Sequence, residues 1–78
     1  PNPFNPSTII NFTLKKRAHV SLKVYNVLGQ EVAELLNRRV AAGTHPVEFI
    51  AHNLTSGIYF YTLQAGNVSV TKKMILMQ

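Results

Sequence analysis

Apolar and polar side chains alternate along much of this chain, and a period of two residues is typical of β-strands. The pattern is cleanest over 19–26, where valine and leucine positions fall on one face and mostly polar positions fall on the other. A similar alternation over 8–14 places Thr8, Ile10, Phe12 and Leu14 on a common face. We therefore predict a strand over each range, with a polar turn at 15–18 between them.

Further strands are predicted between turn signals in the middle of the chain. The segment 26–29 is typical of a hairpin connection, and Gly29 suits the left-handed backbone position that ends such a turn. A second turn over 41–44 precedes a strand over 44–50, in which Val47 and Phe49 face inward. Pro46 lacks an N–H, so its presence within this strand indicates an edge position.

The segment 30–40 carries conflicting signals. Its apolar residues at 32, 35, 36 and 40 have helical spacing, and Glu34 with Arg38 would form an i,i+4 pair on a helix. The segment nevertheless lies between two hairpin signals, and a single helix would interrupt strand pairing in so small an all-β chain. We predict a strand here, which requires tertiary contacts to override the local helix propensity.

Residues 57–78 are predicted to form one closing hairpin. The first arm, 57–64, is rich in β-branched and aromatic residues, and the second runs over 68–76. The turn at 65–67 contains Gly66 and Asn67, which both tolerate the positive φ of hairpin turns. One face of the hairpin is predicted to belong to the core. This face carries Tyr59, Tyr61, Leu63, Val68, Val70, Met74 and Leu76.

The opposite face of the hairpin gathers four large apolar residues at one end, namely Ile58, Phe60, Ile75 and Met77. A neighbouring loop or lysine stems could cover them. Alternatively they form a docking patch, because contiguous exposed apolar surface usually marks an interaction site. Our hypothesis is that these four residues form a recognition patch.

The remaining segments complete a small all-β fold. A proline-rich lead-in, 1–7, excludes a helix and a central strand, and we expect Phe4 to anchor it against the sheet. Leu54 is expected to close the open end of the core from the loop 52–56. The pattern predicts a single domain over 1–78, with the fold of a small antiparallel immunoglobulin-like β-sandwich of six to seven strands.

Composition argues against several chemical functions. The chain has 78 residues and no cysteine, which excludes a disulfide, a thiolate metal site and a cysteine nucleophile. Its three glutamates and three scattered histidines show neither a carboxylate pair in a cleft nor a metal-ligand spacing. There is no G-x-S-x-G motif and no phosphate-cradling glycine loop. We expect no enzyme activity, no metal and no cofactor.

The net charge of +5 attracts polyanions only weakly. The cations form short groups at 15–17, 38–39 and 72–73, and they are not interleaved with aromatic residues as in a nucleic-acid stacking platform. We expect a solvated surface and no nucleic-acid partner. No apolar run approaches the roughly 18 residues of a membrane span.

Several motifs occur together in a fixed order. They are PNPFNPST at 1–8, NVLGQEV at 26–32, AGTH at 42–45, LTSGIYFYTL at 54–63 and KKM at 72–74. Together they resemble the type A C-terminal sorting domain of the type IX (Por) secretion system over essentially the whole chain. The sequence is also similar to the immunoglobulin-like domain of the flagellar hook-capping protein.

The resemblance implies a non-catalytic domain at the end of a larger exported protein. That protein would cross the periplasm and be secreted or attached to the cell surface, and secretion machinery at the outer membrane would recognise the domain. The family motifs imply recognition roles for the lead-in and for parts of the closing hairpin. The matching residues are Pro1, Asn2, Pro3, Phe4, Gly57, Tyr59, Lys72, Lys73 and Met74.

Two alternative functions stay open at this point. Unpaired sheet edges promote self-association, and a head-to-tail contact that does not close produces filaments, so the domain could build an extracellular fibre or layer. An accessory binding domain of a secreted enzyme would instead need exposed coplanar aromatic side chains. Tyr25 and Phe60 are the candidates for that role.

Overall fold

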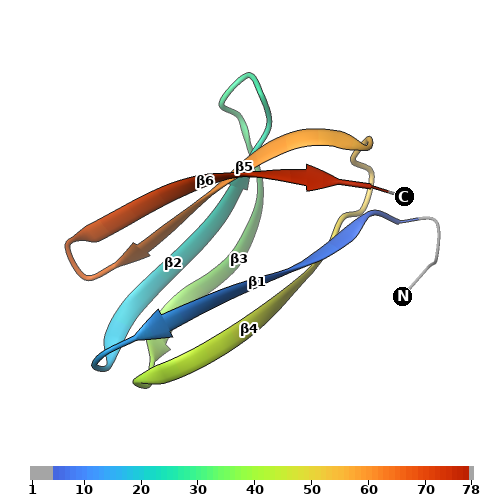
Figure 1. Cartoon of the computed structure of the whole chain (residues 1–78). Helices are drawn as coiled ribbons and strands as arrows, with labels where there is room; N and C mark the ends of the chain where they lie inside the picture. The colour runs from blue at the N-terminus through green and yellow to red at the C-terminus, as the bar shows by residue number, and fades with distance from the viewer. Residues whose placement is uncertain (1–4, 78) are drawn as a thin grey trace.

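The computed structural model describes residues 5–77, which form six strands in two antiparallel sheets (Figure 1). The strands are β1 (Ser7–Leu14), β2 (Ala18–Tyr25), β3 (Glu31–Val40), β4 (Gly43–Ile50), β5 (Gly57–Ala65) and β6 (Val68–Leu76). One sheet pairs β1 with β4, and the other has the order β3-β2-β5-β6. The predicted all-β, immunoglobulin-like sandwich is confirmed.

The strand predicted over 30–40 is also confirmed, and two irregularities in it explain the helix-like spacing. β3 pairs with β2, and its register shifts between Leu22 and Lys23 and again between Val24 and Tyr25. At each shift β3 contains one extra residue, Leu35 and Val32 respectively. An extra residue in a β-bulge changes the phase of the inward side chains. The apolar positions are therefore spaced three or four apart along an extended strand.

The core lies between the two sheets. Val20, Leu22 and Val24 of β2 are fully buried, and every second residue of β1 from Ile10 to Leu14 faces them as predicted. Phe49 is buried and Val47 is partly buried, as expected for the inward residues of β4. Leu54 packs against the cluster that contains Phe49, Tyr59 and Leu76, which confirms its role at the end of the core.

The two hairpin turns are formed by different local interactions. In the β2–β3 turn, the side-chain oxygen of Asn26 accepts hydrogen bonds from the N–H groups of Leu28 and Gln30, both at 3.0 Å. Gly29 has φ +80°, as predicted. In the β5–β6 turn, Gly66 has φ +59° but Asn67 does not have a positive φ. This turn is therefore type II′, which requires glycine at its first central position only, and the prediction for Asn67 was wrong.

One part of the predicted core face is wrong. Val68 and Val70 do share a face with Leu63 and Tyr61, as the register shows, but they are 60% and 42% exposed. The reason is that a two-stranded sheet opposes a four-stranded one, so the edge of the β5–β6 hairpin extends beyond its cover. The lead-in residues Pro1 to Phe4 lie outside the described residues. Just after them, the Pro6 carbonyl accepts a hydrogen bond of 2.8 Å from the Ala51 N–H.

Candidate recognition surface

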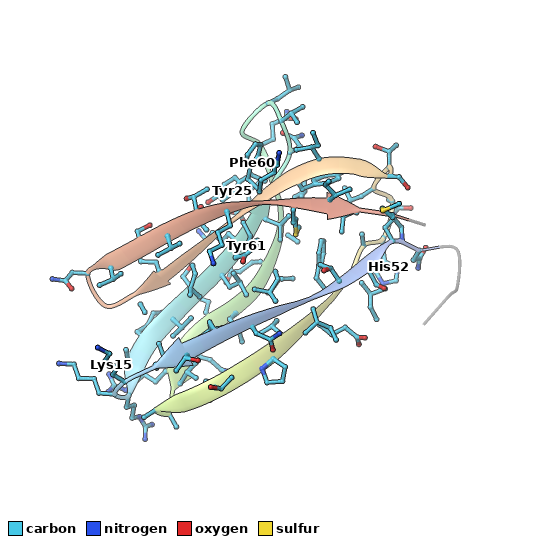
Figure 2. The ribbon with its side chains drawn as sticks, in the orientation of Figure 1. Lys15, Tyr25, His52, Phe60 and Tyr61 are labelled. Atoms are coloured by element: carbon cyan, nitrogen blue, oxygen red, sulfur yellow. The ribbon has the colours of Figure 1, made fainter. Side chains whose placement is uncertain are left out.

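The four residues of the hypothesised patch share the outer face of the β5–β6 hairpin, and we call them the outer patch. Ile58 lies directly opposite Ile75 in the register, and Phe60 lies between Tyr25 of β2 and Lys73 of β6 (Figure 2). Ile75 is 58% exposed and Met77 is 72% exposed, whereas Phe60 is half-buried. Neither a loop nor a lysine stem covers Ile75 and Met77 in the described part of the chain.

The structure adds two residues that the sequence interpretation treated only as part of a turn. Val27 and Leu28 form the tip of the β2–β3 turn, and Leu28 is 80% exposed. A hollow of about 310 Å³ is lined both by this turn and by Ile58 at the beginning of β5. Large apolar residues are unusual in a turn, and that signal could have identified them. The outer patch together with Val27 and Leu28 forms what we call the apolar corner.

The hairpin residues selected by the family motifs do not form one site. Tyr59 is only 6% exposed, and its hydroxyl donates a hydrogen bond of 2.8 Å to the carbonyl of Thr55. Met74 packs partly buried against the core. Gly57 has φ +146°, a region in which side chains are strained. These three residues therefore shape and stabilise the hairpin.

The two adjacent lysines point to opposite faces because side chains alternate along a strand. Lys73 lies opposite Phe60 on the outer face, at the border of the outer patch, whereas Lys72 lies opposite Tyr61 on the inner face. Both are exposed. Of the two lysines, Lys73 is therefore the one that shares a face with the outer patch.

Most of the remaining cationic groups gather at the other end of the sandwich. Residues 15–17 lie in the β1–β2 turn, and the β2–β3 register brings Arg38 and Arg39 opposite Val20 and His19 at this same end. Figure 2 shows Lys15 at the end of β1 remote from His52. The apolar corner lies at the opposite end of the sandwich, where β2 ends. The domain thus has a basic end and an apolar end.

The described residues carry their polar side chains at the surface. No polar or charged side chain is buried among them, and they contain no group of three histidine, aspartate or glutamate residues placed to hold a metal ion. The ion pair found there joins Lys23 to Glu31 at 3.4 Å, away from the core. Over the same residues there is no helix able to cross a membrane.

The fold is a small antiparallel sandwich with an uncovered apolar corner. Residues 1–77 match the model of the secretion system C-terminal sorting domain, and the chain belongs to this family. No curated protein and no solved structure shows significant similarity to the chain. Domains of this family are non-catalytic signals for type IX secretion, and the family is found in secreted or cell-surface proteins.

Proposed function

We propose that this domain directs a larger protein across the outer membrane through the type IX system and contributes to its attachment at the cell surface. We further propose that the apolar corner is the surface that the secretion machinery recognises. The observation that carries this proposal is the exposure of three large apolar residues at one end of a domain from the sorting family. They are Leu28 in the β2–β3 turn, Ile75 in β6 and Met77 just after it.

The physical argument starts from the cost of exposing apolar side chains. Soluble monomers rarely expose large contiguous apolar patches, and such patches usually mark interaction sites. Protein interfaces combine an apolar centre with a polar rim. The outer patch supplies the centre and Lys73 supplies a charged group at its border. This arrangement suits a partner with an apolar groove and an acidic residue beside it.

The residues of the family motifs contribute in two different ways under this proposal. Gly57, Tyr59 and Met74 hold the hairpin in shape. Their neighbours in sequence lie on its outer face, namely Ile58, Phe60 and Lys73. The alternation of side chains along a strand makes this division unavoidable. The lead-in residues Pro1, Asn2, Pro3 and Phe4 stay candidates for recognition through the family motif that they match.

An export assay tests the proposal. The domain is fused to the C-terminus of a periplasmic reporter in a bacterium that has a type IX system, and reporter outside the cell is compared with reporter retained in the periplasm. The test variant is the double substitution Ile75→Ser and Met77→Ser. The matched control is Ile9→Ser, because Ile9 is 60% exposed on the outer face of the other sheet.

We expect the control to be exported normally and the test variant to be retained. Both should keep the unfolding free energy within about 0.5 kcal/mol, because surface substitutions seldom change it by more. Normal export of the Ile75→Ser, Met77→Ser variant would contradict the proposal. So would equal retention of the Ile9→Ser control, because the effect would then not depend on the apolar corner.

A further inference from the structure

The inner face of the β5–β6 hairpin is left partly uncovered beside β1. Two hollows of about 310 and 450 Å³ run along this side, and both are lined by Thr13, Leu63 and Val70. They are therefore continuous, and we call them the β1 groove. Its floor includes the exposed Val68 and Val70, which are the two residues whose burial the sequence predicted wrongly.

The backbone of β1 faces this groove with free hydrogen-bonding groups. The Ala51 N–H donates to the Pro6 carbonyl, which sets the phase of the β1–β4 ladder. Antiparallel pairs alternate between bonded and non-bonded positions, so residues 8, 10, 12 and 14 bond to β4. The N–H and C=O groups of Ile9, Asn11 and Thr13 therefore point away from β4, along the open edge of the sheet.

The other edge of the same sheet is protected. Pro46 lies opposite Asn11, at a non-bonded position of the ladder, so its missing N–H would have pointed outward from β4. A proline at that point prevents another strand from pairing with β4. A strand can therefore be added to this sheet only at β1, which is the side that borders the groove.

The charges around the groove indicate the composition of its occupant. Lys15 and Lys16 line one end and Lys72 lines the other, whereas the residues between them are apolar or uncharged and none of the lining residues is acidic. This arrangement is complementary to an extended segment with carboxylates at its ends and apolar side chains between them. It disfavours a second copy of this chain, because the chain has a net charge of +5 and its own edge strand β6 carries Lys72 and Lys73.

We propose that the β1 groove binds an extended acidic segment of a partner protein, which adds to β1 as the third strand of the two-stranded sheet. Two apolar side chains of this segment cover Val68 and Val70, and its terminal carboxylates pair with the lysines at both ends of the groove. Strand addition of this kind obtains affinity from main-chain hydrogen bonds and specificity from alternate side chains. The inference does not depend on the export function, because it uses the inner rather than the outer face of the hairpin.

The test uses the 78-residue chain and the labelled peptide ETVTVTE, capped at both ends. Its alternate residues place two valines toward the groove with a glutamate at each end, and at about 3.3 Å per residue it spans most of β1. Binding is measured by fluorescence anisotropy at low salt. We expect saturable binding, at least about tenfold weaker binding of the charge-reversed peptide KTVTVTK, and slower amide exchange at Ile9, Asn11 and Thr13 when ETVTVTE is bound.

Two kinds of variant locate the binding edge. Asn11→Pro removes an outward N–H from β1 without removing a bond to β4, and should weaken peptide binding by about tenfold or more. The matched control is Ser69→Pro, which changes the outward edge of β6 and should leave binding unchanged. Should Asn11→Pro fail to fold, the exposed double substitution Lys15→Glu and Lys72→Glu tests the same groove and should abolish the preference for ETVTVTE.

Three results would overturn the proposal. The first is no binding of ETVTVTE to the folded chain, and the second is protection by the peptide of outward amides on β6 rather than on β1. The third is a dimer of the chain alone, seen by light scattering and abolished by Asn11→Pro. In that case the groove would hold a second copy rather than an acidic partner.

Discussion

Gly57 offers a direct test of whether a family-motif residue acts through the backbone. Its φ is +146°, and a Cβ placed on it meets no atom within 4 Å. The substitution Gly57→Ala should therefore create no steric clash with neighbouring residues, and its whole effect should come from holding alanine in a backbone region that is nearly exclusive to glycine. Strain of this kind costs about 1–3 kcal/mol.

This cost is a substantial part of the stability of a chain of this size. At about 0.05–0.15 kcal/mol per residue, a domain of 78 residues has an unfolding free energy of about 4–12 kcal/mol. Each kcal/mol lost lowers Tm by about 4–8 °C in small domains. Gly57→Ala should therefore lower Tm by about 4 °C at the least and by more than 20 °C at the upper end of the strain range.

The assay is urea unfolding followed by far-ultraviolet circular dichroism and by tyrosine fluorescence, since the chain has no tryptophan. Gly29→Ala is the matched control, because a Cβ there also meets no atom within 4 Å, while its φ of +80° lies in the ordinary left-handed region that ends a hairpin turn. Its cost should be about 1–2 kcal/mol. The reasoning is refuted if Gly57→Ala leaves the unfolding free energy unchanged, whether or not export is lost.

Three further predictions follow from packing and hydrogen bonding, each measured by urea unfolding. Tyr59→Phe removes the hydroxyl that donates to the Thr55 carbonyl and should cost about 1 kcal/mol; no loss would show that water replaces the bond. Leu22→Ala empties a fully buried position and should cost about 2–5 kcal/mol, and a smaller loss would mean that the core collapses around the cavity. Pro46→Thr should change the unfolding free energy by less than about 1 kcal/mol. It should nevertheless increase light scattering at high concentration, because it frees the outer edge of β4 for pairing. Unchanged scattering would contradict the protective role of Pro46.

The sequence predicted the strands well where side chains alternate without interruption. In β2, every inward position from Val20 to Val24 could be named in advance, because one face is buried and the other is exposed. In β3, the same logic was obscured by two extra residues, Val32 and Leu35, which shift the phase of the alternation. The strand was predicted from its neighbours rather than from its own pattern, since a bulge in an extended strand and a turn of helix produce similar apolar spacing.

Burial on the hairpin could be predicted only in part. The register determines which side chains share a face, but it does not determine how many strands lie opposite that face. Leu76 and Tyr59 are covered, whereas Val68 and Val70 on the same face are not, because the opposing sheet has only two strands. The contribution of Val27 and Leu28 to the apolar corner was missed for a related reason. It depends on the position of a turn relative to β5, and the local signal for it is the unusual presence of two large apolar residues in that turn.

The side chains of the edge strand β6 contribute to three different surfaces of this fold. Leu76 and Met74 face the core. Ile75 faces outward within the outer patch, and Lys73 faces outward beside it. Val70 forms part of the β1 groove. Because side chains alternate, neighbouring positions of this strand belong to different surfaces. Substitutions in it should therefore be grouped by the face that they alter, not by their proximity in sequence. A loss of export from a change at Met74 and one from a change at Ile75 would then have different causes, unfolding in the first and a lost contact in the second.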